Sequence, residues 1–250
     1  MSVVDLLKSK LGGEKPQMLF MDIDGVLTVA RGSYVLDLDA IRLLRSLQEK
    51  GIPVCLVSGN AYPTVLTLQR YLGLSPYFVA ENGCVIQVGK ELVVLCKGNM
   101  DSIVEEIKRE FKLEESPSNK YRLCDRAFHI PSDIKGNAQL IRELEKQIME
   151  AFPEVYAYYT GYVLHVYPRE CSKSTGMKIL AIKLNIDLGK SLAVGDSMTD
   201  IDMVKAVGVG VVVGDADEEA KREAILVLPY KASESTKYFL AEVLKYLETM

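Results

Sequence analysis

The sequence predicts an α/β protein with a doubly wound, mostly parallel sheet that carries an inserted α+β domain. Two observations predict this fold class. Short, nearly all-apolar strand candidates alternate with helix candidates toward both ends of the chain, as in parallel sheets whose two faces are covered by helices. Between residues 84 and 167 the alternation stops and paired strands appear. The parallel pattern resumes afterwards, so the middle segment is predicted to be an insertion.

The alternation starts at QMLFMDI (17–23), an apolar run that reads as a buried strand. An amphipathic helix candidate follows and ends at Gly51, a residue typical of helix ends. The next candidates repeat the rhythm with strand 52–58, helix 61–74 and strand 77–82. After the insertion come helices 174–186, 200–207, 217–224 and 236–248 and strands 191–196, 209–213 and 225–229.

The middle segment has a different organisation. CVIQVGKELVVLC (84–96) reads as a β-hairpin around Gly89. The remaining candidates are helices 101–111 and 136–152 and strands 120–130, 155–160 and 162–168. We therefore predict a Rossmann-like core domain of residues 16–83 and 168–250, with residues 84–167 as an inserted cap domain.

Composition excludes several classes of function. The 250 residues are 48% hydrophobic, and 30 basic and 34 acidic side chains give a net charge of −4. These charges are interspersed, so we expect neither nucleic acid nor a membrane surface as a partner. No apolar run approaches transmembrane length. The N-terminus reads as a short helix or arm of a cytoplasmic protein, and a homodimer is compatible with the sequence.

Cysteine and histidine give no metal-binding pattern. The five cysteines lack CxxC spacing, which favours buried reduced thiols over a zinc or redox site. The only histidines are His129 and His165, so a histidine-rich metal centre is excluded. We expect each histidine to be an ordinary strand residue.

Acidic residues instead follow strand candidates directly. Asp22 and Asp24 end the first strand, Asp196 ends the strand at 191–196, and Asp200 lies four residues further on. In doubly wound sheets functional groups gather beyond the carboxyl ends of the strands. Clustered carboxylates without histidine or cysteine form a hard-oxygen site that suits Mg²⁺, which commonly shares substrate phosphate.

Four further residues suit a phosphate group. Ser58 can donate its hydroxyl, Gly59 exposes a backbone N–H at a strand-to-helix turn, and Lys173 can neutralise a phosphoryl oxygen. Asn60 can be either a helix cap or a ligand contact. For phosphoryl transfer we assign Asp22 as the nucleophile and Asp24 as the general acid and base.

The motifs MDIDGVLT (21–28), VSGN (57–60), Lys173 and GDSMTDIDM (195–203) resemble the four motifs of haloacid dehalogenase superfamily phosphatases. AENG (80–83) extends the resemblance to the Cof-type and sucrose-phosphate phosphatase-like branch with an inserted α/β cap, and most closely to archaeal phosphoglycolate phosphatases.

The resemblance implies a Mg²⁺-dependent phosphomonoester hydrolase with an aspartyl-phosphate intermediate and phosphoglycolate as substrate. Two positions depart from the family pattern, Thr199 for asparagine and Asp215 within Gly-Asp-Ala, and Asp215 could bring negative charge near the phosphate. The implied Mg²⁺ ligands are Asp22, the main-chain carbonyl of Asp24 and Asp196, with Asp200 supporting or joining them, and Lys173 and Ser58 hold phosphate.

Other functions stay open at this point. A sugar-phosphate phosphatase or a phosphomutase could use the same site. A phospho-receiver also surrounds an aspartate with acids, a hydroxyl and a lysine, but needs neither the insertion nor Asp24. Lys120, Arg122 and Arg126 share one face of strand 120–130, which either meets a substrate carboxylate or faces solvent.

Overall fold

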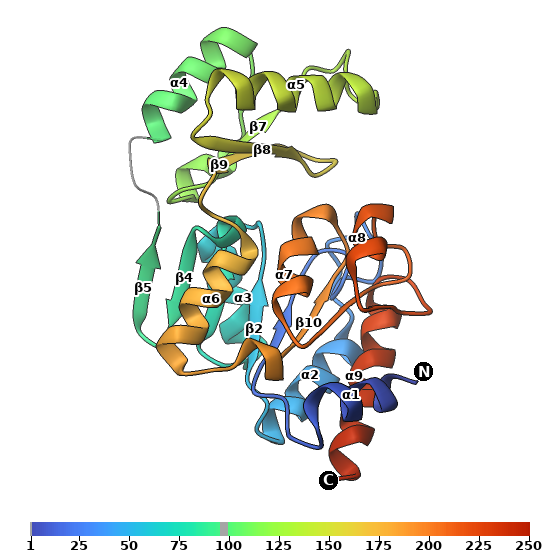
Figure 1. Ribbon diagram of the computed structural model, residues 1–250. Helices are drawn as coiled ribbons and strands as arrows, with labels where there is room; N and C mark the ends of the chain where they lie inside the picture. Colours follow the sequence, from blue (N-terminus) through green and yellow to red (C-terminus); the bar gives the residue numbers. More distant parts are fainter. Residues whose placement is uncertain (1, 96–99) are drawn as a thin grey trace.

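The computed structural model describes residues 2–95 and 100–250, which form two units, each built around its own sheet (Figure 1). The large unit contains an eight-stranded sheet in the order β12-β11-β10-β1-β2-β3-β4-β5. All pairs are parallel except β3 with β4 and β4 with β5, which confirms the predicted fold class. Its strands are β1 (Leu19–Met21), β2 (Val54–Val57), β3 (Tyr77–Ala80), β4 (Val85–Val88), β5 (Glu91–Val94), β10 (Leu192–Gly195), β11 (Val209–Val212) and β12 (Leu226–Val227).

Helices cover this sheet because each has one apolar face. The helices are α1 (Val3–Leu11), α2 (Leu38–Glu49), α3 (Tyr62–Tyr71), α6 (Lys173–Leu184), α7 (Ile201–Ala206), α8 (Glu218–Glu223) and α9 (Ala232–Glu248). α1 and α2 both pack against α9, while α6 packs on β3, β4 and α7. Leu6, Leu7 and Leu11 of α1 are buried in the main hydrophobic cluster. The core therefore includes α1, and the predicted start at residue 16 is wrong.

The small unit is an antiparallel sheet in the order β6-β7-β9-β8, with two helices and a separate hydrophobic cluster. In Figure 1 the small unit lies above the large unit, at the end of the large sheet where α6 begins. Its elements are α4 (Met100–Phe111), β6 (Glu114–Glu115), β7 (Arg126–His129), α5 (Ala138–Ala151), β8 (Val155–Tyr159) and β9 (Leu164–Pro168).

The predicted boundary at residue 84 is wrong, because hairpin β4–β5 extends the large sheet. The cause is the turn η1 (Glu81–Gly83), in which three successive residues have positive φ angles of 52°, 53° and 97°. This turn reverses the chain, so that Val85 pairs with Ala80 in an antiparallel register. The predicted strand 120–130 is also shorter, since Pro117–Tyr121 forms a 3₁₀ helix and only Arg126–His129 is extended.

The strand order places the chemically important ends together. β1 lies between β10 and β2 in the sheet. The chain continues from β1 to β2 and β3 on one side, and β10, β11 and β12 are added later on the other side. This is a topological switch point, where the carboxyl ends of open α/β sheets form a crevice. Asp22, Ser58 and Asp196 directly follow β1, β2 and β10. Lys173 is the first residue of α6, whose start is fixed by Ser172 accepting the Thr175 N–H.

Three of the cysteines agree with the thiol prediction and one does not. Cys55, Cys84 and Cys171 are free and buried. Cys124 is disulfide-bonded, so the expectation of a thiol is wrong there, and Cys96 lies outside the described residues.

Among the described helices, none is both long and apolar enough to cross a membrane.

Candidate active site

Three buried carboxylates meet at the switch point. Oxygen atoms of Asp22, Asp196 and Asp200 all lie within 4.8 Å of one another. Asp22 is held by its backbone N–H, which donates to the Val194 carbonyl, so neighbouring strands fix its position. These acids were predicted from the sequence to share one metal site, and the structure brings them together.

Lys173 is the cation at the centre of this cluster. Its Nζ donates to Asp22 Oδ1 at 2.9 Å and to Asp200 Oδ1 at 2.5 Å, and its side chain is buried. The other oxygen of Asp200 accepts from the N–H groups of Asp196 and Ser197 and from the Ser197 hydroxyl. Both oxygens of Asp200 are thus occupied by protein donors, which makes Asp200 a support for Lys173 and for the Asp196 loop.

The cluster holds more negative charge than its cations balance. Burial raises the pKa of Asp22 well above its usual value, and the neighbouring acids add to this against the opposing charge of Lys173. Burial and Asp200 likewise raise the pKa of Asp196 to about 7. Asp200 behaves differently: burial acts to raise its pKa, but Lys173 and hydrogen bonds hold that pKa below its usual value.

Asp24 lies beside this cluster, and its exposed carboxylate is not one of the three clustered acids. Asn60 Nδ2 donates to Asp24 Oδ2 at 2.7 Å and to Ser58 Oγ at 3.1 Å. Ala61, not Asn60, is the N-cap of α3. Asn60 therefore links the predicted acid/base residue to the predicted phosphate site, and the alternative of a helix cap is wrong.

Gly25 allows the first loop to approach Asp196 closely. Its φ angle is +74°, and a Cβ atom placed there would lie 2.2 Å from Asp196 Oδ2. A side chain is thus excluded by both backbone conformation and space. The glycine that follows Asp24 is a requirement of the acid cluster.

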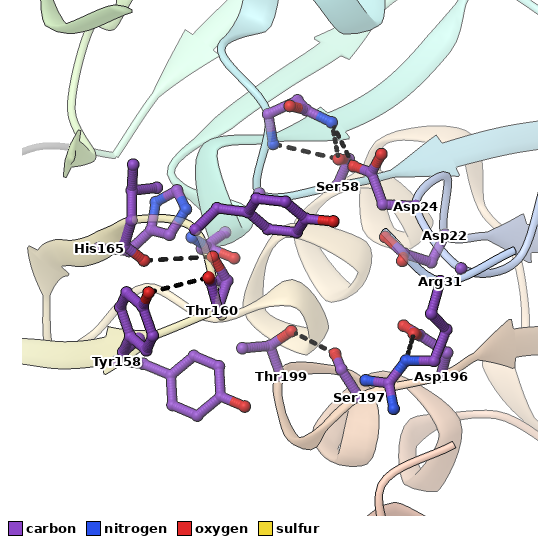
Figure 2. A pocket seen from close by; sticks show the side chains of 18 of the residues that line it. Asp22, Asp24, Arg31, Ser58, Tyr158, Thr160, His165, Asp196, Ser197 and Thr199 are labelled. Carbon is purple, nitrogen blue, oxygen red and sulfur yellow. Dashed lines mark hydrogen bonds and ion pairs between the residues drawn. The ribbon is translucent and has the colours of Figure 1, made fainter. Parts of the chain in front are cut away.

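Arg31 is a site residue that was not predicted from the sequence. Its Nε pairs with Asp196 Oδ2 at 2.8 Å and its Nη2 with Asp217 Oδ1 at 2.8 Å, while Nη1 donates to the Asp215 carbonyl. Figure 2 shows this side chain reaching toward Asp196. Arg31 comes from a loop without periodicity or motif, so no sequence signal indicated it.

The two departures from the family pattern occupy different positions. Thr199 lines the cavity, and its hydroxyl is 2.8 Å from that of Ser197. The Asp215 carboxylate accepts the Ala232 N–H and is not among the residues that line the cavity. Asp215 thus caps α9 from outside, and its expected effect on bound phosphate has no support in this geometry.

A cavity of about 470 Å³ lies between the acid cluster and the small unit. In Figure 2, Asp22, Asp24 and Ser58 come from the large unit, and Tyr158, Thr160 and His165 approach from the small one. Tyr34 of the large unit and Tyr162 of the small unit both line this cavity, and their ring centroids are 6.1 Å apart. The inserted unit is thus a cap over the site.

Glu81 joins this cap to the core. Its fully buried carboxylate accepts the backbone N–H groups of Leu123, Cys124 and Asp125 in the cap and of Tyr62 in the core. Burial raises the pKa of Glu81, against the lowering effect of these hydrogen bonds. The AENG motif indicated this segment, although the sequence did not suggest its role.

A second polar network lies on the cap side of the cavity. Asp125 Oδ2 accepts from Arg122 Nη1 at 2.5 Å, from His165 Nδ1 at 2.6 Å and from Asn82 Nδ2 at 3.3 Å. Arg122, His165 and Asn82 all line the cavity. The expectation that His165 is an ordinary strand residue is therefore incomplete. Of the other predicted cations on this segment, Lys120 stacks on Tyr121 and Arg126 pairs with Asp101.

The sequence of this chain matches a known protein family. Residues 19–126 and 99–240 match the model of the haloacid dehalogenase-like hydrolases. The chain belongs to this family. The match covers both the acid cluster and the cap, and it confirms the enzyme class expected from the sequence, a phosphatase of the haloacid dehalogenase superfamily.

Curated relatives of this hydrolase cover nearly its whole length. It is 37% identical over 229 residues to phosphoglycolate phosphatase 1 of Saccharolobus solfataricus, covering 92% of this chain and 96% of the relative. It is 33% identical over 228 residues to the phosphoglycolate phosphatase of Sulfolobus acidocaldarius, covering 91% and 96%.

Solved structures support the fold of this hydrolase. The crystal structure of Thermoplasma acidophilum 0175 superposes with a TM-score of 0.80 at 23% identity, covering 95% of this chain and all of that one. The subclass IIB sugar phosphatase BT4131 superposes with a TM-score of 0.70 at 18% identity, covering 94% and 100%. At these identities the likeness concerns the fold alone.

Proposed function

We propose that this hydrolase is a Mg²⁺-dependent phosphomonoesterase that acts through an aspartyl-phosphate on Asp22, with 2-phosphoglycolate as its substrate. The observation that carries the proposal is that Asp22, Lys173 and Ser58 line one cavity, with Lys173 Nζ 2.9 Å from the Asp22 carboxylate. A carboxylate, a cation and a hydroxyl around one cavity can bind and attack a phosphoryl group.

The first step uses Asp22 and Asp24. A carboxylate oxygen of Asp22 forms a bond to phosphorus while the bond from phosphorus to the ester oxygen breaks, and Asp24 donates its proton to that leaving oxygen. In the second step Asp24 takes a proton from water, whose oxygen attacks phosphorus and releases phosphate from Asp22. Asn60, at 2.7 Å from Asp24 Oδ2, holds the acid at the cavity between these steps.

Lys173 and Ser58 stabilise the phosphoryl group as charge develops on its oxygens. Fixed donors that need no reorganisation are the main catalytic contribution of a protein to phosphoryl transfer. Asp200 holds Lys173 through a 2.5 Å hydrogen bond. Asp200 thus acts on the reaction through Lys173.

The acid cluster fits Mg²⁺. The donor set of Asp22 and Asp196 is purely oxygen and buried, and the main-chain carbonyl of Asp24 would complete the protein's share, with Asp200 in support. The raised pKa values of Asp22 and Asp196 reflect negative charge that a divalent cation would offset. When bound, Mg²⁺ would supply charge stabilisation for the transferring phosphoryl group.

The substrate is proposed from the relatives and from the size of the site. Relatives that share 33% and 37% identity over more than nine-tenths of the chain are named phosphoglycolate phosphatases. A cap over a cavity of about 470 Å³ suits small phosphoesters and excludes bulk water from the aspartyl-phosphate.

Phosphate release from a panel of small phosphomonoesters, with Mg²⁺ and with EDTA, tests this proposal. We expect metal-dependent turnover that is highest on 2-phosphoglycolate and falls by at least about 10³-fold in Asp22→Asn. Full activity in that variant would contradict the nucleophile assignment. A higher kcat/KM for sugar phosphates would favour the sugar-phosphate alternative, and isomerisation without phosphate release would favour a mutase.

A further inference from the structure

Arg122 lines the cavity from the cap, next to the loop proposed to bind phosphate. Its side chain is only 5% exposed, yet it borders the same cavity as Ser58 and Lys173. Its Nη1 donates to the Gly59 carbonyl at 3.0 Å. Arg122 therefore lies directly against the backbone of the proposed phosphate site.

Lys173 and Arg31, two other basic side chains that line the cavity, direct their donors toward the acid cluster. Lys173 donates to Asp22 and Asp200. All three nitrogens of the Arg31 guanidinium contact acceptors from the Asp196 side of the site. In contrast, Arg122 Nη2 has no hydrogen-bond partner among residues 2–95 and 100–250, while its Nη1 and Nε are engaged. Arg122 thus keeps unused donors at the cavity.

Asp125 fixes the orientation of these donors. It is fully buried, and one of its oxygens accepts from Arg122, His165 and Asn82. A buried ion pair is weak evidence for stability, since desolvation offsets its attraction. The contacts with Asp125 and Gly59 hold the guanidinium so that the two N–H groups of Nη2 can donate to an anionic ligand in the cavity.

We propose that Arg122 binds the carboxylate of the substrate and that Asp125 is its positioning residue. The inference rests on the proposed function, because it requires the phosphoryl group to lie at Ser58, Gly59 and Lys173. It defines the substrate class as short phosphomonoesters with a carboxylate close to the ester oxygen. It also assigns specificity to a cap residue, whereas the chemistry belongs to the core.

The test compares two esters that differ in one group, 2-phosphoglycolate and 2-hydroxyethyl phosphate, which has a hydroxymethyl in place of the carboxylate. The wild-type protein is expected to prefer phosphoglycolate by at least about 10-fold in kcat/KM, since a hydrogen bond to a charged group corresponds to about 10- to 150-fold. Arg122→Lys keeps the charge but loses the Nη2 N–H groups and the planar guanidinium that holds them in place. It should lower kcat/KM for phosphoglycolate by that factor, mainly through KM, and change the neutral ester by less than about threefold.

Arg109→Lys is the matched control, because Arg109 is an exposed residue of the cap helix α4 and does not line the cavity. It should leave both esters unchanged. Equal losses on both esters in Arg122→Lys, or none, would overturn the inference. If Arg122→Lys does not fold, a wild-type preference below about 10-fold overturns it by itself. Failure of the proposed function is distinct, because neither ester would then be hydrolysed with Mg²⁺.

Discussion

Lys173 Nζ lies 2.9 Å from Asp22 Oδ1 although the two residues are 151 positions apart in the sequence. The contact joins the first strand of the core to the first helix after the cap. Lys173 also bridges to Asp200, so one ammonium group is shared by two buried carboxylates. The same contact thus closes the core around the insertion and prepares the proposed nucleophile.

Replacing Lys173 with methionine should damage both stability and activity. The change leaves Asp22 and Asp200 buried without their cation, which is expected to lower the free energy of unfolding by about 3–5 kcal/mol. Phosphate release should fall by about 10²–10³-fold with the loss of a donor to the phosphoryl group. Urea unfolding and steady-state kinetics measure the two effects. Lys178→Met on the exposed face of the same helix is the control, and equal stability of the two variants would contradict the prediction.

Gly25→Ala should displace Asp196 in addition to straining the backbone at residue 25. A left-handed alanine costs about 1–2 kcal/mol, and at Gly25 the new Cβ would in addition meet Asp196 Oδ2 at 2.2 Å. Gly89→Ala isolates the first cost, because Gly89 has a φ angle of +61° and nothing within 4 Å of its Cβ position. We expect about 100-fold or greater loss of kcat only in Gly25→Ala. Similar kinetics in both variants would show that Asp196 moves freely.

The acid cluster could be predicted from sequence because its members follow strands. The carboxyl ends of parallel strands share one edge, so Asp22, Ser58 and Asp196 had to lie close together once the strands were recognised. Lys173 followed from its place at a helix start. In contrast, Arg31 lies on an irregular loop, and its partners are 165 and 186 residues away in the sequence (196 − 31; 217 − 31). No local pattern records such a contact.

The residues on the cap side of the site could not be predicted from the sequence for related reasons. The hairpin β4–β5 has the same local signal whichever sheet it joins, and the turn at Glu81–Gly83 depends on left-handed backbone that glutamate seldom adopts. Asp125 and His165 are 40 residues apart and meet only once the cap sheet has formed. Sequence periodicity thus defines the elements, while the pairing of a short hairpin is decided by the turn that precedes it.

Asp196→Asn should stabilise the metal-free protein at neutral and higher pH. The folded-state pKa of Asp196 is about 7, against a usual value of 3.8. Between these values the unfolded chain has lost its proton and the folded protein has kept it, so stability falls as pH rises through this window. The asparagine escapes this penalty, which is at most about 4 kcal/mol.

Thermal unfolding in EDTA at pH 4 and pH 8 measures this effect. The difference between Asp196→Asn and the wild type should grow in favour of the variant at pH 8, and exposed Asp133→Asn should show no such trend. Added Mg²⁺ should stabilise the wild type more than the variant. A variant that is less stable than the wild type at pH 8 in EDTA would contradict the assigned charge imbalance.

Glu81→Gln should loosen the attachment of the cap without touching the acid cluster. The glutamate carboxylate accepts N–H groups from Leu123, Cys124 and Asp125, and a glutamine amide would present N–H donors in place of one acceptor oxygen. The free energy of unfolding should fall by about 1–3 kcal/mol. Amide hydrogen exchange at Leu123 and Asp125 should accelerate, while exchange in the β1 strand at Phe20 stays close to that of the wild type.

The exposed Glu143→Gln is the control for this change, since its carboxylate bonds only to Gln139 on the same helix among the described residues. Because Glu81 holds the N–H of Asp125 and that of Leu123, which follows Arg122, a loosened segment should also raise KM for 2-phosphoglycolate more than it lowers kcat. Unchanged exchange at Leu123 and Asp125 would contradict the assigned role of Glu81 in holding this segment.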